Sequence, residues 1–334
     1  MIEPTKIAVI GLGGISQVNH LPILKKMSHV DVVAVCDINK NRLFSVAHKF
    51  GVKSTYTDYK EMLQNSNFEA VIVATPTSSH KEIAIDCIKA KKNVLIEKPI
   101  ARTYSETEEI VNAAKKDNVQ IMVGMNMRYR PDIMLLKSII NAGDLGTPFY
   151  VKLGWLRKQS SEGKWFTKKE DAGGGVILDL GIVLLDIALW LLDFPEIKTI
   201  STHNYCINTK YVEDSSISFM RCQPDSIISL ETSWSLSSEK DSFYLNVHGS
   251  KGSASLNPLR IIRRSEDQQI DLTPFKTENP LALFKKSYTN ELKHFVGSVR
   301  GLNPILSTGD EALSRMKIIE NMYRSAKENS EIKI

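Results

Sequence analysis

The sequence predicts an α/β domain with a doubly wound parallel sheet, followed by an α+β domain with a large, mostly antiparallel open sheet. Three observations predict this class. Short β-branched runs alternate with helical patterns from residue 6 to residue 123, as in successive β–α units. Strand-like segments follow one another between residues 149 and 256, with one long helix among them. A chain of 334 residues is also long for a single core, so we expect domains over residues 1–124 and 125–334.

The first half reads as a series of β–α units. Strands are expected at residues 6–10, 30–36, 52–56, 70–74, 93–96 and 120–123, and helices at 18–27, 58–63, 81–90 and 105–117. Units of this length form a parallel sheet with helices on both faces. Ligands of such sheets bind at the carboxyl ends of the strands. We therefore look for the site in the loops that follow them.

A glycine-rich loop, GLGGIS, follows the first expected strand at once. Its spacing, Gly11, Gly13 and Ser16, is the dinucleotide fingerprint with a small residue in place of the third glycine. Gly11 allows the tight turn, and Gly13 allows backbone amides to approach a pyrophosphate at a helix N-terminus. We expect Gly11, Gly13, Gly14 and Ile15 to bind the cofactor, which makes residues 1–124 a dinucleotide-binding domain.

An acidic residue, Asp37, ends the second expected strand. It lies about 20 residues past the loop, where a carboxylate accepts hydrogen bonds from the adenosine ribose. A carboxylate there repels the 2′-phosphate of NADP, so Asp37 favours NAD. Lys40 and Arg42 follow closely and could accept that phosphate, which keeps NADP open as the alternative.

Three further groups fall at expected strand ends: the pair Thr75 and Pro76, then His80, and then Glu97 with Lys98. We expect all five residues at the cofactor. Lys98 has the most chemical content, because a lysine there can donate a proton to a substrate if burial or a nearby charge lowers its pKa. The alternative is an ordinary surface lysine before a proline turn. His80 is expected to form hydrogen bonds or contact a ribose.

The second half carries a stretch, residues 172–194, in which three glycines lead into a long apolar helix. Strands are expected at residues 149–156, 198–207, 215–221, 226–235, 242–248 and 253–256, and closing helices at 281–299 and 310–327. The glycines at 173–175 let backbone approach another backbone or a ligand. At helical spacing Asp179, Val183 and Asp186 share one stripe. Asp179 with Val183 could face a reaction site, or the acids could be ion-paired in an ordinary core helix.

Aromatic and basic residues cluster just before the glycine run, at Trp155, Arg157, Trp165 and Lys168. Such side chains suit a polyhydroxylated or phosphorylated ligand, and we expect Trp155, Arg157 and Trp165 to bind substrate. The alternative is that they pack on the sheet. A large open sheet also needs a partner on its other face, so we expect a homo-oligomer, a dimer or tetramer, formed through the C-terminal sheet.

Composition excludes several classes of protein. Forty-three Lys and Arg against 38 Asp and Glu give a net charge of +5, and the basic pairs are interspersed with acids, so no nucleic-acid partner is expected. Four cysteines without C-x-x-C spacing predict a reducing compartment and no metal site. The N-terminus has no signal-peptide pattern. Asp179, Gly181 and Asp186 interrupt the longest apolar stretch, so we expect a cytoplasmic protein without a membrane span.

Six motifs together carry a family resemblance. They are GLGGIS, the acid at 37, ATPTSSH at 74–80, EKP at 97–99, MNMRYRP at 125–131 and GGGVILDLGIVLLD at 173–186. Over essentially the whole chain the sequence resembles the Gfo/Idh/MocA oxidoreductases, the family of glucose-fructose oxidoreductase and inositol dehydrogenase. The resemblance implies a Rossmann domain and NAD(P)-dependent oxidation or reduction at a carbinol carbon of a sugar, cyclitol or nucleotide sugar.

The resemblance also implies site residues. The family's usual catalytic set is the lysine of EKP with an aspartate and a histidine on the long helix. Lys98 and Asp179 match the first two, and each is also expected to bind substrate. Arg128 and Tyr129, in MNMRYRP, are expected beside the substrate as well. Residues 125–334 are then a substrate-binding and oligomerisation domain.

The third member of the set does not match. The family's helix usually reads D-x-G-x-H-x-x-D, and here Val183 stands at the histidine position. Valine cannot accept a proton, so only a substrate contact is expected there. Three explanations stay open: Lys98 supported by Asp179 acts as acid and base, a nearby tyrosine such as Tyr129 supplies the proton, or the protein binds the cofactor without turnover as a sensor or regulator.

Overall fold

The structure is a computed structural model that describes residues 3–158, 167–265, 268–275 and 278–334. The chain divides into two compact units. The first unit comprises Met1–Asn126 and Ser287–Ser314, and the second comprises Met127–Lys286 and Arg315–Ile334. Residues 287–314 thus pack with the amino-terminal half of the chain. The domain limits at residues 124 and 125 stay a prediction.

The first unit contains a six-stranded parallel sheet, as its sequence predicts. Its strands are β1 (Thr5–Ile10), β2 (Val30–Cys36), β3 (Ser54–Tyr56), β4 (Ala70–Val73), β5 (Asn93–Glu97) and β6 (Ile121–Gly124). Their order is β3-β2-β1-β4-β5-β6, and all neighbours pair in parallel. β1 and β4 lie in the middle, and almost every residue of both is buried. Their carboxyl ends therefore meet at one edge.

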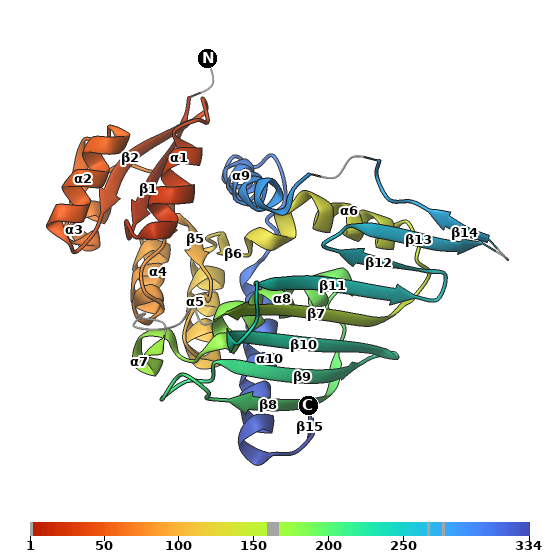
Figure 1. Ribbon diagram of the computed structural model, residues 1–334. Helices are drawn as coiled ribbons and strands as arrows, with labels where there is room; N and C mark the ends of the chain where they lie inside the picture. The colour runs from red at the N-terminus through yellow and green to blue at the C-terminus, as the bar shows by residue number, and fades with distance from the viewer. Residues whose placement is uncertain (1–2, 159–166, 266–267, 276–277) are drawn as a thin grey trace. The chain divides into compact units, whose positions relative to one another are not determined.

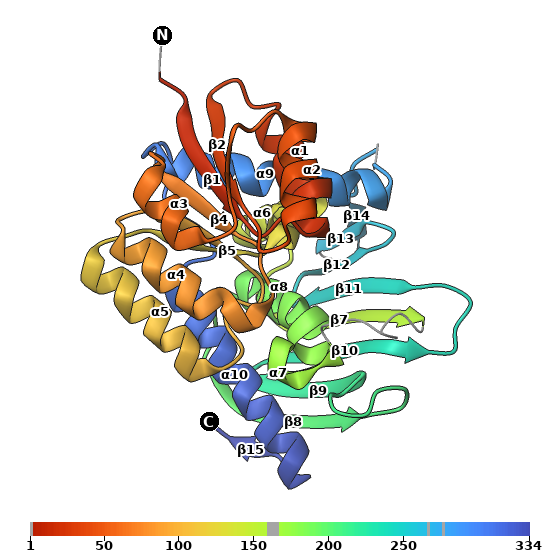
Figure 2. The same ribbon diagram turned by 90° about the vertical axis from the view of Figure 1, so that its left-hand side faces the viewer.

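Helices alternate with these strands. They are η1 (Ser16–His20), α1 (Leu21–Leu24), α2 (Lys40–Phe50), α3 (Tyr59–Asn65), η2 (Thr77–Ser79), α4 (His80–Lys89) and α5 (Tyr104–Asp117). Side-chain caps define three helix starts: Asn39, Asp58 and Thr103 each accept a backbone N–H of the first turn. Figure 2 shows α4 and α5 side by side next to the strands.

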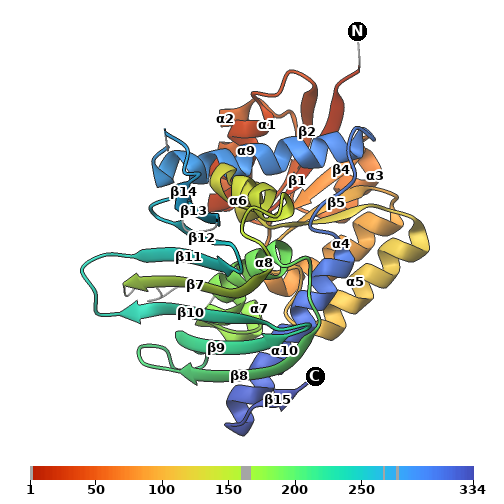
Figure 3. The same cartoon turned by 90° about the vertical axis from the view of Figure 1, so that its right-hand side faces the viewer.

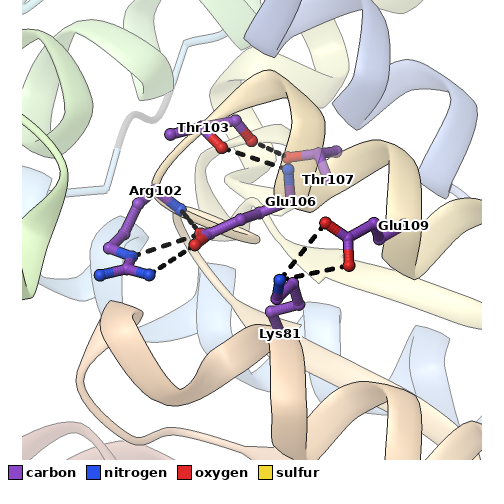
Figure 4. Close-up of polar contacts among 6 residues, drawn as sticks. All are labelled: Lys81, Arg102, Thr103, Glu106, Thr107 and Glu109. Carbon is purple, nitrogen blue, oxygen red and sulfur yellow. Dashed lines mark hydrogen bonds and ion pairs between the residues drawn. The ribbon is translucent and has the colours of Figure 1, made fainter.

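The start of α5 is fixed by a compact polar cluster (Figure 4). Thr103 Oγ1 accepts from the Glu106 amide at 3.1 Å. The Glu106 carboxylate in turn accepts from the Arg102 amide at 3.0 Å and from the Arg102 guanidinium. Lys81 on α4 lies 3.2 Å from the Glu109 carboxylate on α5. The chain is therefore anchored within five residues of Pro99.

The second unit contains a nine-stranded sheet (Figures 1 and 3). Its strands are β7 (Pro148–Lys158), β8 (Ile197–Tyr205), β9 (Ser215–Cys222), β10 (Ser226–Leu236), β11 (Ser242–Gly249), β12 (Gly252–Leu256), β13 (Arg260–Ser265), β14 (Gln268–Asp271) and β15 (Ile332–Lys333). The order is β14-β13-β12-β11-β7-β10-β9-β8-β15. Only β7 and β10 pair in parallel among these strands. The predicted mostly antiparallel sheet is confirmed, with three strands more than expected.

The remaining helices are η3 (Asn126–Tyr129), α6 (Pro131–Asn141), α7 (Lys169–Ala172), η5 (Ile177–Gly181), α8 (Ile182–Leu191), α9 (Pro280–Val299) and α10 (Gly309–Glu328). α9 and α10 match the expected closing helices to within one residue. α6 is an addition to the predicted elements. η5 and α8 together form the expected long apolar helix.

The long apolar helix lies against the sheet of the second unit, on β7 and β10. The stretch Lys169–Leu191 is long and apolar enough to cross a membrane by length and composition, and 89% of its most apolar window is buried. A core helix has the same properties. Its first part, η5, is a π-helical turn, a feature that often marks functional sites.

Candidate functional site

The loop after β1 needs a glycine at its first position for two reasons. Gly11 has φ +89°, a conformation that other residues rarely adopt. A Cβ on Gly11 would also lie 2.5 Å from the Ala74 carbonyl oxygen at the end of β4. Ser16 then packs against the turn, since its buried hydroxyl donates to the Gly11 carbonyl at 2.6 Å. The fingerprint residues thus have the structural roles that their spacing predicts.

Gly13 and Gly14 differ from Gly11. Within the described part of the chain no atom lies within 4 Å of where a Cβ on either residue would be. The loop then runs through Ile15 into the π-helical turn η1 and directly into α1. Open space beside bare backbone at the start of a helix is what a dinucleotide pyrophosphate requires. The loop therefore fits NAD.

Asp37 is 5% exposed and lies at the carboxyl end of β2. Its carboxylate accepts from the amides of Leu12 and Asn39, both at 2.8 Å. Arg42 donates to both carboxylate oxygens, again at 2.8 Å. Burial raises the pKa of Asp37, but the hydrogen bonds from Arg42, Asn39 and Leu12 outweigh it and leave the pKa lowered. Asp37 is therefore ionised and accepts a hydrogen bond from the glycine loop. It is also paired with Arg42, one of the two basic residues that could have bound the 2′-phosphate of NADP.

His80 joins the ends of two neighbouring strands. Its Nε2 lies 2.8 Å from the Thr75 carbonyl oxygen, after β4, and its Nδ1 lies 2.9 Å from the Pro99 carbonyl oxygen, after β5. The side chain is 1% exposed. Burial lowers the pKa of His80, and the two carbonyl groups oppose this shift. Its expected hydrogen-bonding role is present, whereas a cofactor contact of this ring stays a prediction.

Glu97 and Lys98 end β5, and both are partly buried. The Lys98–Pro99 peptide is cis. His20, at the end of η1, is fully buried and its Nε2 lies 2.8 Å from Glu97 Oε1. Burial raises the pKa of Glu97, but the neighbouring His20 and Lys98 outweigh it and hold the pKa low. An ionised Glu97 thus lies directly beside the candidate proton donor.

The glycine run of the second unit brings backbone close to protein groups. Gly173 ends α7 in the left-handed region, with φ +86°. A Cβ on Gly174 would collide with the Tyr323 hydroxyl, and one on Gly175 with the Glu213 carbonyl oxygen. The sequence left open whether these glycines approach protein or a ligand. At Gly174 and Gly175 the close neighbours are protein atoms.

Glu213 holds the start of the long helix. Its Oε1 accepts from the amides of Gly175 and Ile177, both at 3.0 Å, and from the Tyr323 hydroxyl at 2.8 Å. The residue is buried, and this burial raises its pKa despite the three donors. A carboxyl group at a helix N-terminus satisfies amides that would otherwise lack partners. Glu213 therefore fixes the turn that carries Asp179.

Asp179 lies in η5 and its Oδ2 accepts from the indole Nε1 of Trp234 at 3.1 Å. Trp234 is buried in an apolar cluster with Val176, Leu180 and Val212. Val183, one turn beyond Asp179, is 4% exposed. Asp179 lies in the π-helical turn, whereas Val183 lies in the α-helix that follows it.

Asp186 has a structural role. Arg128 donates to both of its oxygens, at 2.6 and 2.7 Å, and Arg315 donates to Oδ1 at 2.6 Å. All three side chains are almost fully buried. The Arg128 guanidinium also lies over the ring of Phe194. This is the ion-paired alternative for Asp186. Arg128 is engaged in the core of the second unit, and a substrate contact of Arg128 stays a prediction.

The other expected substrate residues differ in setting. Tyr129 is buried. Trp155 packs against the cluster that contains Trp234 and meets Phe243 edge-on at 5.5 Å between ring centroids. Arg157 lies over the Trp155 ring, with Nε 3.8 Å from Asp241 Oδ2. Trp165 lies outside the described residues. These contacts of Trp155 and Arg157 are those expected if the two side chains pack on the sheet. Substrate binding by them stays a prediction.

Three residues that contact predicted site residues or the turn that carries them were missed from the sequence: His20 next to Glu97 in the first unit, and Glu213 and Trp234 next to the turn of Asp179 in the second. His20 could have been found, because it lies four residues after the fingerprint serine, on the buried face of the following helix. Glu213 and Trp234 lie 34 and 55 residues after Asp179 in the chain, and no local pattern links them to it. Among the described residues, no group of three or more His, Cys, Asp or Glu could hold a metal ion.

Comparisons with known proteins agree with this geometry. Residues 5–125 match the family model described as "Oxidoreductase family, NAD-binding Rossmann fold". Residues 137–334 match the model described as "Oxidoreductase family, C-terminal alpha/beta domain". Together the two models span nearly the whole chain.

Curated relatives and a solved structure point the same way. The chain is 25% identical to D-glucoside 3-dehydrogenase of Escherichia coli, covering 99% of this chain and 98% of that one. It is 28% identical to scyllo-inositol 2-dehydrogenase (NAD(+)) of Bacillus subtilis, covering 94% and 92%. The crystal structure of GenD2 from gentamicin A biosynthesis, in complex with NAD, superposes with a TM-score of 0.87 at 25% identity, covering 100% and 97%.

Proposed function

We propose that the protein is a dehydrogenase of sugars, cyclitols or nucleotide sugars. The proposal starts from its family: this chain belongs to the Gfo/Idh/MocA oxidoreductases, with their NAD-binding Rossmann fold. The chain is thus an NAD(P)-dependent enzyme that acts on CH–OH groups. The relatives named above act on a glucoside and on an inositol. We infer a polyhydroxylated substrate of the same kind, since a ring of secondary alcohols is common to both.

The observation that carries the proposal is the pair of cofactor-binding features at the ends of β1 and β2, the open glycine loop and the ionised Asp37. The open backbone at Gly13 and Gly14 can hold the pyrophosphate. The ionised Asp37 can accept hydrogen bonds from the adenosine ribose. When bound, NAD accepts or donates the hydride. We also place Thr75, Pro76 and Glu97 at the cofactor, because they end the adjacent strands β4 and β5.

Lys98 gives or takes the proton at the substrate oxygen in this account. It follows β5. In the sheet, β4 lies between β5 and β1, the strand that precedes the glycine loop. Asp179 either adjusts the charge state of Lys98 or accepts a hydrogen bond from a substrate hydroxyl. Its carboxylate is already oriented by Trp234. We expect Lys98→Ala to lower turnover by about 10²-fold or more, the usual contribution of a positioned acid or base.

Val183 influences the direction of the reaction. Oxidation of an alcohol needs a base, whereas reduction of a ketone needs a proton donor. A lysine can donate a proton. Val183 stands where the family usually has the histidine that serves as the base. We therefore propose that ketone reduction is the favoured direction.

The alternative is a sensor or regulatory protein that binds the dinucleotide and no longer transfers a hydride. It predicts tight NADH binding with no turnover for any sugar. Val183→His discriminates between the two. If this variant gains turnover where the parent has none, the alternative is favoured. If the parent already shows turnover, the dehydrogenase stands and the variant changes only its rate.

We also propose that the protein is a homo-oligomer joined through the nine-stranded sheet. On one face of the sheet Ile217 and Phe219 are 52% and 42% exposed, and Tyr205 on the neighbouring strand is 50% exposed. Apolar side chains in adjacent rows favour burial against a second copy.

Ile217→Lys with Phe219→Lys tests this surface. Light scattering should show a smaller particle than the parent, whereas Phe44→Lys, an exposed aromatic position on α2, should leave the mass unchanged. An unchanged mass in the double variant would contradict an interface at this face.

A further inference from the structure

We propose that His20 and His80 are positioning residues that hold the Glu97–Lys98–Pro99 turn from its two sides. The inference rests on the proposed function, because it concerns the placement of Lys98. Both histidines lie in helices that follow a central strand: His20 at the end of η1, after β1, and His80 at the start of α4, after β4. Each contacts a residue directly adjacent to Lys98 in the chain.

His80 holds the far side of the turn. Its ring lies between two carbonyl oxygens, that of Pro99 at 2.9 Å and that of Thr75 at 2.8 Å. Thr75 in turn accepts from Ser79 at 2.8 Å, through its hydroxyl. The ring is 1% exposed, so water does not replace either contact readily. One buried side chain thus sets the distance between the loop after β4 and the turn after β5.

His20 holds the near side. Its side chain is fully buried, and Nε2 lies 2.8 Å from Glu97 Oε1. Tyr288 meets the His20 ring edge-on, with 6.4 Å between the centroids. The other Glu97 oxygen lies 3.3 Å from the Lys98 amide and 3.1 Å from where a Cβ on Gly124 would be. The carboxylate is therefore held by His20 at one oxygen and by the Lys98 amide at the other, and Gly124 leaves no room for a larger side chain beside it.

The chain is also anchored beyond the turn, where α5 begins at Thr103. Lys98 thus lies in a short connection whose flanking residues are each held by a separate buried contact. The two histidines belong to the same segments as the loops expected to hold the cofactor: His20 follows GLGGIS, and His80 bonds to Thr75. They link the position of Lys98 to those loops. A misplacement of about 1 Å in such a group can cost about 10²-fold in rate.

The test uses the full-length protein and four variants: His20→Ala, His80→Ala, His20→Gln, and Met62→Ala as a control for lost stability. Met62 is fully buried in α3 of the same unit. Two measurements are made on each variant. The first is the rate at which acetic anhydride modifies the Lys98 amine, read by mass spectrometry relative to the exposed Lys25. The second is steady-state turnover, with the NADH dissociation constant from fluorescence.

The proposal predicts that both histidine-to-alanine variants change the relative modification rate of Lys98, and that Met62→Ala does not. Turnover number should fall by about 10²-fold with the substrate KM little changed. His20→Gln should recover part of the loss, because its amide can donate to Glu97. If Lys98 reacts alike in the alanine variants and in the control, the proposal is overturned. Should the parent lack turnover with every substrate, the proposed function fails and the modification rates alone still decide this inference.

Discussion

At the scale of single residues, Asp37 shows how the cofactor site is prepared before any ligand binds. Its carboxylate is ionised and accepts four hydrogen bonds, two of them from Arg42. A ribose must therefore share the carboxylate with Arg42. The same pairing holds Arg42 away from a 2′-phosphate, which agrees with NAD as the cofactor.

Asp37→Ser tests this pairing. We expect NADH affinity to fall about ten- to a hundredfold, the worth of one charge-assisted hydrogen bond. Arg42 then loses its carboxylate partner, so the ratio of NADPH to NADH affinity should rise. Fluorescence titration of both nucleotides measures the two effects. Asp31→Asn, an exposed change on β2, is the matched control, and an unchanged affinity ratio in Asp37→Ser would argue against the assignment.

Trp234→Phe tests the orientation of Asp179. The change removes the indole N–H that lies 3.1 Å from the carboxylate and keeps an aromatic ring in the cluster. We expect the turnover number to fall about tenfold, because a hydrogen bond to a charged group is lost. Val212→Ala leaves a space in the same cluster but keeps the indole N–H, so it should retain the turnover number. Equal losses in both variants would show that packing alone matters.

At the scale of elements, the two glycine segments have opposite surroundings. The loop after β1 leaves open space beside Gly13, whereas the run before η5 packs Gly175 against the Glu213 backbone. Sequence patterns present both as flexible glycine-rich stretches. The structure separates a segment that approaches a ligand from a segment that approaches protein.

Alanine substitutions distinguish the two segments. Gly13→Ala should leave the melting temperature near that of the parent and weaken NADH binding, because its Cβ projects into the space for the pyrophosphate. Gly175→Ala should destabilise the protein by about 1–3 kcal/mol or more, the usual cost of overpacking. Thermal unfolding and NADH titration measure both. A stable Gly175→Ala variant, or a Gly13→Ala variant with full NADH affinity, would contradict this difference.

The sequence predicts most elements because their signals are local. The parallel sheet follows from alternating apolar runs, and the loop after β1 follows from glycine spacing. β13, β14 and β15 were missed, since β13 carries Arg260, Arg263 and Arg264 and the other two are short. β14 and β15 are the edge strands of the sheet and β13 lies next to β14, and strands near an edge are often short or charged. The π-helical turn η5 was also not foreseen, because such a turn has no simple sequence pattern.

The site is less predictable than the fold, since its contacts join distant parts of the chain. Asp37 and the glycine loop have the predicted setting because a spacing rule links them. Arg128 was expected at the substrate, which stays a prediction, and its pairing with Asp186, 58 residues later, was not foreseen. His80 was expected at the cofactor, which stays a prediction, and no sequence pattern indicated that its ring lies between two protein carbonyls. Type and position alone do not tell which partner a buried polar side chain finds.

At the scale of the whole molecule, the buried His80 makes stability depend on pH. Burial lowers the pKa of His80 below its ordinary value of 6.5. The unfolded chain therefore binds more protons than the folded one between the folded pKa and about 6.5. The stability that the neutral ring contributes is present above this window and is lost as the pH falls through it.

His80→Gln should remove this contribution. The free energy of unfolding of the parent should fall more steeply below about pH 6.5 than that of the variant, by up to about 1.4 kcal/mol per pH unit. Denaturant titrations at several pH values measure the difference. The other titrating groups are common to both proteins and cancel in the comparison. Parallel curves for parent and variant would show that His80 does not titrate in this way.

The central claim is that this chain transfers a hydride between NAD and a polyhydroxylated substrate with Lys98 as the proton donor or relay. The most direct measurement is the absorbance of the reduced nicotinamide, with NAD+ and NADP+ against sugars, cyclitols and nucleotide sugars, and with NADH against the corresponding ketones. We predict turnover with at least one member, faster for NADH with a ketone, and its loss in Lys98→Ala. Confirmed NADH binding without turnover for any member of the panel would contradict the claim.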